Sequence, residues 1–226
     1  MVAAVAAYEL ARRAIAPDRF LAVRHAHDVL RLERALGISW EVSLQRAFLH
    51  APAVVDVLGA VYLCSQFAVT AAFFVWLYRR APDAYRRFRD GFLVATALAL
   101  LVHWRYPVAP PRLAGVGVED TVARLLHADV ASRLTDPLAA VPSLHAGWAL
   151  GVGVGLVLYA RRRVWRVAGL LYPCVVVLAT VVTGNHFLLD APAGFAALGL
   201  GFRLTLLLSP AHGARLVAAP RGGAVR

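Results

Sequence analysis

The chain has 226 residues, of which 60% are hydrophobic and only 16% are charged, and its mean hydropathy is +0.64. Soluble domains are about a quarter charged, so this composition excludes an ordinary soluble protein and predicts an integral membrane protein. The net charge is +11. Because the arginines lie between apolar runs, we assign that charge to membrane topology and to contact with anionic membrane lipids, and we expect no nucleic-acid partner.

Residues 1–50 are predicted to form interfacial or amphipathic helices, of which the first is interfacial or only partly inserted. Residues 1–16 begin with an apolar run that is too short to cross a bilayer, which takes about 20 residues, and they lack the basic start of a signal peptide. Residues 18–36 have an amphipathic helical pattern that is typical of a helix on the membrane surface. Glu33 lies away from the apolar stripe, which consists of Leu21, Val29, Leu32 and Leu36.

Five apolar stretches follow, and we expect each to be a transmembrane helix. They cover residues 53–78, 91–104, 139–160, 164–182 and 187–208. Together they predict an all-α fold, a polytopic membrane helix bundle whose catalytic domain covers residues 51–209. The basic residues 210–226 are expected to form a disordered cytoplasmic tail.

The distribution of arginine predicts which loops face the cytoplasm. Loop 79–89 holds five Arg and one Asp, and loop 161–166 holds four Arg and no acid, whereas residues 105–140 hold four Arg and four acids. Basic loops stay on the cytoplasmic side. We therefore expect a multi-pass protein of the cell membrane in which residues 105–138, the start of the third span and the segment around residue 186 share the extracytoplasmic face.

Residues 183–190 are the most chemically distinctive stretch, and they interrupt the apolar sequence between the last two spans. His186 and Asp190 are four residues apart, so on a helix they would lie on one face. A carboxylate in that position can hold one imidazole nitrogen and leave the other free as a base or nucleophile. This pair is the predicted catalytic centre.

Two further segments on the predicted outer face carry phosphate-binding chemistry. Arg105 and Arg112 flank six residues of a Pro-rich loop, and guanidinium groups bind phosphate oxygens in a bidentate manner. Ser143 and His145 lie at the expected start of the third span, with Pro142 at the first helical position, and the free N–H groups there can bind an anion. The alternatives are an interfacial Arg pair and a lone interfacial His without a catalytic role.

Together these residues predict phosphoryl transfer. His186 attacks phosphorus, Asp190 orients its imidazole, and His145 protonates the departing oxygen. The two arginines and Ser143 bind the phosphate. We expect neither a cofactor nor a metal ion, because the sequence shows no carboxylate cluster to hold one.

These motifs resemble those of the type 2 phosphatidic acid phosphatase (PAP2) superfamily, which has Lys-x6-Arg-Pro, Pro-Ser-Gly-His and Ser-Arg-x5-His-x3-Asp. The resemblance covers roughly residues 55–208. It implies a bundle that normally has six spans, a lipid phosphate substrate and the residue roles given above. The matching segments, in chain order, are Arg105-x6-Arg112-Leu113, Pro142-Ser143-Leu144-His145 and His186-x3-Asp190. The first has Arg in place of Lys and Leu in place of Pro, and the second has Leu in place of Gly.

The third segment departs from the family pattern, because Ala179-Thr180 stands where the family has Ser-Arg. Thr183 and Asn185 are therefore additional candidates for the phosphate site. Pro-Ser-Leu-His and Thr-Gly-Asn-His resemble the branch that contains inositol phosphorylceramide synthases, which move a phospho-headgroup between lipids. Two reactions stay open: hydrolysis of a lipid phosphate, lipid pyrophosphate or lipid-linked phosphodiester, and transfer to a second hydroxyl.

Two other classes of function also stay open. His103, His145 and His186 lie on or beside predicted spans, as the ligands of a haem-binding bundle would, although haem ligation explains neither Asp190 nor the arginines. For His103 we expect packing or a place in the aromatic belt rather than chemistry. A non-catalytic lipid-binding or scaffold protein would keep its function after loss of His186 or His145.

Overall fold

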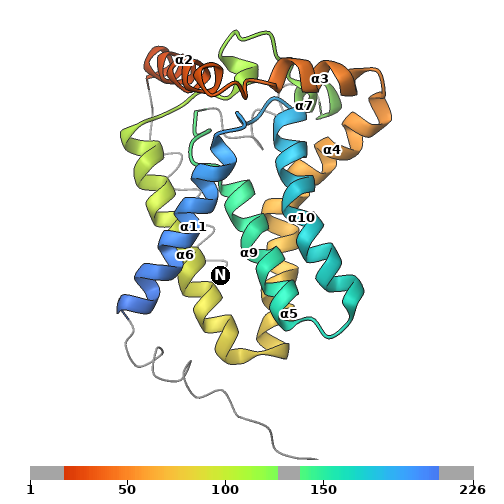
Figure 1. The fold of residues 1–226 in the computed structure, drawn as a ribbon, viewed down its shortest axis with the longest axis vertical. Helices are drawn as coiled ribbons and strands as arrows, with labels where there is room; N and C mark the ends of the chain where they lie inside the picture. Colours follow the sequence, from red (N-terminus) through yellow and green to blue (C-terminus); the bar gives the residue numbers. More distant parts are fainter. Residues whose placement is uncertain (1–17, 127–137, 209–226) are drawn as a thin grey trace, which may run out of the picture.

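The structure is a computed structural model that describes residues 18–126 and 138–208. The expectations for residues 1–16 and for the tail 210–226 lie outside the described residues. The described part is helical and contains no strand, as the sequence predicts (Figure 1). Its α-helices are α2 Arg19–Ala35, α3 Glu41–Leu49, α4 Pro52–Cys64, α5 Thr70–Arg80, α6 Pro82–Arg105, α7 Thr121–Leu126, α9 Leu144–Tyr159, α10 Arg163–Val182 and α11 Asp190–Leu208.

Three helical segments are long and apolar enough to cross a membrane, namely Pro52–Arg80, Arg163–Val182 and Asp190–Leu208. The first of them joins α4 and α5 through the π-helical residues Ser65–Val69. Helix α9 is a shorter apolar helix, and α6 has 24 residues and begins with a charged segment. The membrane character of the chain is thus confirmed, and of the five predicted transmembrane helices three meet the criteria of length and composition.

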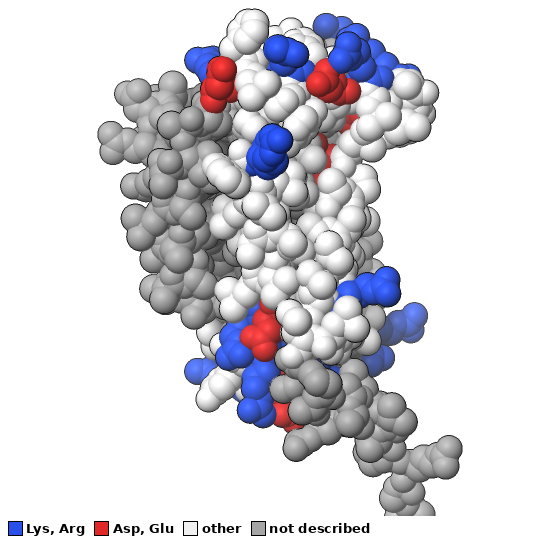
Figure 2. All heavy atoms as spheres, turned by 90° about the vertical axis from the view of Figure 1, so that its left-hand side faces the viewer, with Lys and Arg blue, Asp and Glu red and all other residues white. Residues whose placement is uncertain are grey.

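The charged side chains mark the two ends of the bundle. On the face drawn in Figure 2 they gather towards both ends and leave a broad uncharged zone between them, which is the distribution expected across a bilayer. The turns that follow α5 and α9, which carry the basic loops, lie at one end, whereas α2, α3 and the loop between α10 and α11 lie at the other (Figure 1). The structure therefore separates the basic loops from the predicted catalytic segments.

Close helix packing positions α9 between its neighbours. Gly147 of α9 faces the backbone of Gly194 in α11, and a Cβ atom on Gly147 would lie 2.8 Å from the Gly194 carbonyl oxygen. On its other side, Gly153 faces the backbone of Gly169 in α10. Small residues at such crossings let helix backbones approach closely. The approach brings the start of α9 next to the start of α11, where the predicted catalytic residues lie.

Helix α2 lies across the end of the bundle (Figure 1), but its buried face is not the predicted apolar stripe. Leu32 and Leu36 of that stripe are 53% and 57% exposed. Glu33, which lies away from that stripe, is buried, and it accepts a hydrogen bond from a backbone amide of the α10–α11 loop. The buried face of the helix consists mainly of small residues together with Leu30, whereas Phe20 and Leu32 are exposed. Its buried residues are Ala22, Ala26, Leu30 and Glu33.

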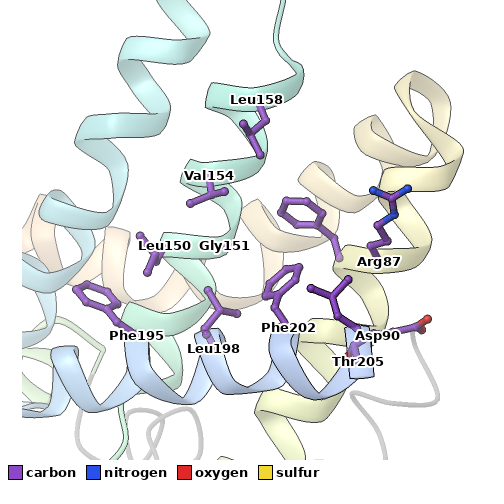
Figure 3. Close-up of a pocket in the computed structure, with 13 residues that line it drawn as sticks. Arg87, Asp90, Leu150, Gly151, Val154, Leu158, Phe195, Leu198, Phe202 and Thr205 are labelled. Carbon is purple, nitrogen blue, oxygen red and sulfur yellow. The ribbon is translucent and has the colours of Figure 1, made fainter. Parts of the chain in front are cut away.

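An apolar pocket of about 390 Å³ lies between α6, α9 and α11 (Figure 3). Arg87 and Asp90 of α6 contribute the charged part of its wall. Most of the remaining lining is aliphatic or aromatic and includes Leu150, Val154, Phe195, Leu198 and Phe202.

Candidate active site

Helix α10 ends at a glycine that turns the chain towards the site. Gly184 has a φ of +75°, in the left-handed region that glycine adopts without steric cost. A Cβ atom there would also lie 2.9 Å from the carbonyl oxygen of Glu119. The N–H groups of Asn185 and His186 donate to the carbonyl of Thr180 at 2.9 and 3.1 Å. These bonds satisfy the helix end and place His186 in the loop that follows.

His186 and Asp190 contact each other, but not on a shared helical face as predicted. His186 lies before α11, and Asp190 is the first residue of that helix. His186 Nδ1 lies 3.0 Å from Asp190 Oδ2 and 2.9 Å from the carbonyl oxygen of Ala140. Because two acceptors face Nδ1, we assign the proton to that nitrogen, which leaves the Nε2 lone pair for chemistry. The N–H of Phe187 also donates to Asp190 Oδ2, at 2.8 Å.

The second motif forms the start of α9. Ser143 is the N-cap, and its hydroxyl accepts a hydrogen bond from the N–H of Ala146 at 3.2 Å. The N–H of Ser143 donates to the carbonyl of Asp190 at 3.0 Å, which ties the starts of α9 and α11 together. Helix α9 begins at Leu144, so Pro142 precedes the cap and does not occupy the first helical position as predicted.

His145 lies opposite His186. Its ring stacks on Tyr62 of α4, with centroids 4.4 Å apart, and its centroid lies 5.7 Å from that of His186. The two histidines border a cavity of about 30 Å³. A cavity of this size accommodates water-sized groups. The lining residues are Tyr62, Gln66, His103, Ala139, Ala140, Leu144, His145, Asn185 and His186.

Arg112 is held against the loop that carries His186. Its Nε donates to Asn185 Oδ1 at 2.9 Å, and a terminal nitrogen donates to Asp120 Oδ2 at 2.8 Å. Asn185 Nδ2 donates in turn to Thr183 Oγ1 at 2.9 Å. The Arg112 side chain is only 6% exposed. Thr183 and Asn185 thus support a buried guanidinium group next to the segment that carries His186.

The sequence matches the profile of the PAP2 superfamily over residues 27–204, which is most of the chain and includes all three motif segments. The chain belongs to the PAP2 superfamily. Comparisons with curated proteins and with solved structures found no match. Membership indicates a phosphatase or phosphotransferase.

The remaining predicted residues of this PAP2 protein lie in different settings. Arg105 is the last residue of α6, is exposed, and does not line the cavity. Thr180, which stands where the family has Arg, is buried, and its hydroxyl donates to the carbonyl of Val177 at 2.8 Å. His103 was expected only to pack, yet it lines the cavity, with Nε2 3.1 Å from the carbonyl oxygen of Pro142.

Two acidic residues of the surface helices were not predicted to contact the site. Glu33 of α2 accepts a hydrogen bond from the N–H of Leu189 at 2.8 Å, and Glu41 of α3 accepts one from the N–H of Leu188 at 3.0 Å. The signal for Glu33 was its helical spacing from the small residues Ala22 and Ala26, which an analysis of large apolar residues overlooks. Within the described residues, no group of three His, Cys, Asp or Glu side chains is arranged to hold a metal ion.

Proposed function

We propose that this PAP2 protein transfers the phosphoryl group of a lipid phosphate through a phosphohistidine at His186. The observation that carries this proposal is the environment of the imidazole. Asp190 and the Ala140 carbonyl both accept from Nδ1, and His186 lines the same cavity as His145. An oriented imidazole with its second nitrogen free is a nucleophile paired with a nearby proton donor.

The reaction proceeds in two balanced steps. His186 Nε2 attacks phosphorus, the P–O bond to the lipid breaks, and His145 gives its proton to the departing oxygen. Asp190 stabilises the positive charge that forms on the His186 ring. His145 then accepts a proton from the incoming hydroxyl as its oxygen attacks phosphorus. The P–N bond breaks, and the phosphoryl group leaves on the acceptor.

Arg112 supplies positive charge for the phosphate oxygens. Its position is fixed by Asn185 and Asp120, and a preorganised cation stabilises the charge that develops on a transferring phosphoryl group. We assign secondary roles to two residues at the same end of the bundle. Arg105 contacts the lipid headgroup region, and Ser143 caps α9. Thr183 acts through Asn185.

The acceptor distinguishes a phosphatase from a phosphotransferase. A cavity of about 30 Å³ favours water, which would make the reaction hydrolysis. The resemblance of the second and third motifs to inositol phosphorylceramide synthases supports a headgroup hydroxyl instead. The same small volume disfavours a haem macrocycle between these histidines. We place the site on the extracytoplasmic face of a bundle of five membrane-crossing helices, because the basic loops lie at the opposite end.

The test is turnover by the purified protein in detergent with EDTA, using phosphatidic acid and an isoprenyl pyrophosphate, with and without inositol. We expect release of inorganic phosphate, or formation of inositol phosphate if an inositol hydroxyl is the acceptor, and the loss of either product in His186→Ala. Glu119→Gln is the matched control, because this outer-end side chain is 62% exposed. Equal product from wild type and His186→Ala, or no product from any substrate, would overturn the proposal.

A further inference from the structure

Three carboxyl groups from three different helices meet at the start of α11. Glu33 comes from α2, Glu41 from α3 and Asp190 from α11 itself. They accept hydrogen bonds from the consecutive N–H groups of residues 189, 188 and 187. These amides lie at the N-terminal end of α11, where N–H groups lack intrahelical acceptors. The three residues between His186 and Asp190 thus each donate a backbone N–H hydrogen bond to a carboxyl group.

The three groups are buried too deeply to carry three negative charges together. Glu33 and Asp190 are 0% exposed, and Glu41 is 2% exposed. Within the described residues, Glu33 Oε2 and Asp190 Oδ1 have no hydrogen-bond donor. Burial, reinforced by the neighbouring carboxylate of Glu41, raises the pKa of Glu33 to about 8. A protonated Glu33 supplies the missing donor, because its O–H group can donate a hydrogen bond to the carboxyl group of Glu41.

We propose that Glu33 and Glu41 are positioning residues for His186. Glu33 in its neutral form shares its proton with Glu41, and the two side chains hold the backbone N–H groups of Leu189 and Leu188. This clamp acts through the backbone. The loop from His186 to Asp190 contains only three intervening residues, so a shift of their amides moves the carboxylate that orients the imidazole. The kinetic part of this inference rests on the function proposed for His186.

Ionisation of Glu33 should therefore weaken the site. The groups that face it are Glu41 from α3 and Asp190 from α11, and Asp190 is bonded to His186. Above the pKa of Glu33, the shared proton is lost and Glu33 becomes a buried negative charge that faces the carboxyl groups of Glu41 and Asp190. Like charges repel strongly at buried positions. We expect the loop to loosen and the rate of the chemical step to fall.

The kinetic test compares kcat as a function of pH in wild type, Glu33→Gln and Glu119→Gln. Glutamine keeps an acceptor for the Leu189 amide and a donor for Glu41, but it does not ionise. The ratio of kcat in Glu33→Gln to kcat in wild type should rise as pH passes about 8, since other ionisations cancel in the ratio. The same ratio for Glu119→Gln should stay flat. A flat Glu33→Gln ratio across this range would overturn the proposal.

A second pair of variants separates positioning from folding. Glu33→Ala should lower kcat about 10- to 100-fold with little change in KM, because small displacements of reacting groups have effects of this size. Glu33→Gln should restore most of the rate near neutral pH. If Glu33→Ala is too unstable to assay, the pH dependence of the kcat ratio between Glu33→Gln and wild type still tests the positioning role. Equal rates in Glu33→Ala and wild type would contradict a positioning role.

A measurement without turnover keeps this inference distinct from the proposed reaction. Folding raises the pKa of Glu33 from 4.5 to about 8, so the folded state binds a proton that the unfolded state releases in this range. The thermal midpoint should therefore fall as pH rises from 4.5 to about 8, and Glu33→Gln should lack this contribution. If no lipid phosphate is turned over but this difference appears, the clamp exists and the proposed function fails. Identical pH slopes would refute the clamp, whatever the activity.

Discussion

Two cavities lined by the described residues differ in character. The cavity at the α2–α3 end has a volume of about 30 Å³ and is bordered by three histidines, a tyrosine, a glutamine and an asparagine. The pocket between α6, α9 and α11 has about 390 Å³ and is mostly apolar (Figure 3). The two share no lining residue. The larger cavity has more room for a ligand, but the smaller one is lined by the histidines to which we assign the reaction.

The difference lies in how many segments build each cavity. The apolar pocket is lined by three helices, and its formation needs only imperfect packing of bulky side chains. The small cavity takes residues from α4, the π-helical segment Ser65–Val69, α6, the segment before α9, α9 and the α10–α11 loop. Hydrogen bonds orient three of its polar side chains, those of His103, Asn185 and His186. This convergence of distant segments, rather than the volume of the cavity, supports the proposal that the chemistry takes place here.

The largest effect should come from the orienting carboxylate. Asp190→Asn keeps the size of the side chain but places an amide against Nδ1, which disfavours the tautomer needed for attack by Nε2. We expect kcat to fall about 10³- to 10⁴-fold, as for other oriented imidazoles. Asp83→Asn, at the exposed opposite end, is the control. A loss below tenfold in Asp190→Asn would remove Asp190 from the mechanism.

His145→Ala should reduce kcat by about 10²- to 10⁴-fold for a lipid alcohol leaving group, because proton donation by a positioned acid contributes that much. The loss should shrink for a substrate with an acidic phenol as leaving group, which departs without a proton. Steady-state kinetics with the two substrate types measures the difference. The same loss for both types would assign His145 another role.

Arg112→Ala should reduce kcat/KM by about 10²- to 10³-fold, in line with loss of one preorganised charge-stabilising group. Asn185→Ala, which removes the hydrogen bond to Nε of that arginine, should have a smaller effect in the same direction. Arg105→Ala should affect kcat/KM less than either, because Arg105 is exposed, whereas Arg112 is buried and is bonded to Asn185, the residue before His186. Reversal of this order, measured as kcat/KM, would mean that Arg105 is the main phosphate ligand.

Substitution in the apolar pocket should have the smallest effect. Val154→Phe adds an aromatic ring to the wall of the pocket (Figure 3), where space exists to accommodate it. We expect kcat to stay within about twofold of wild type, since the reacting groups lie elsewhere and surface or cavity-filling changes are usually mild. A strong loss of kcat in Val154→Phe with an unchanged thermal midpoint would show that the apolar pocket influences the reaction, and it would contradict the distinction between the two cavities.

The sequence predicted the chemical groups better than their geometry. Spacing and residue type singled out His186, Asp190, His145 and Arg112, which the structure brings to one end of the bundle. The i, i+4 spacing predicted a helical pair, but Gly184 ends α10 and leaves His186 in a loop. Spacing alone cannot show whether a contact is made within a helix or across a turn.

The burial of Glu33 could not be predicted because the backbone amide that it binds, that of Leu189, lies 156 positions away in the chain. An amphipathic pattern identifies the face with large apolar residues, but α2 buries its small-residue face instead. The same limit applies to Arg105, whose motif spacing carries no information about how α6 ends. Tertiary partners, rather than local pattern, determine these positions.

The most direct test of the central claim is chemical trapping of the intermediate. Rapid acid-free denaturation during turnover of a ³²P-labelled lipid phosphate, followed by alkaline peptide mapping, should give a label that is stable to alkali, labile to acid and located on His186. Slower second-step turnover should increase its yield, and His186→Ala should show none. Label on another residue, or continued turnover in His186→Ala, would contradict the phosphohistidine mechanism.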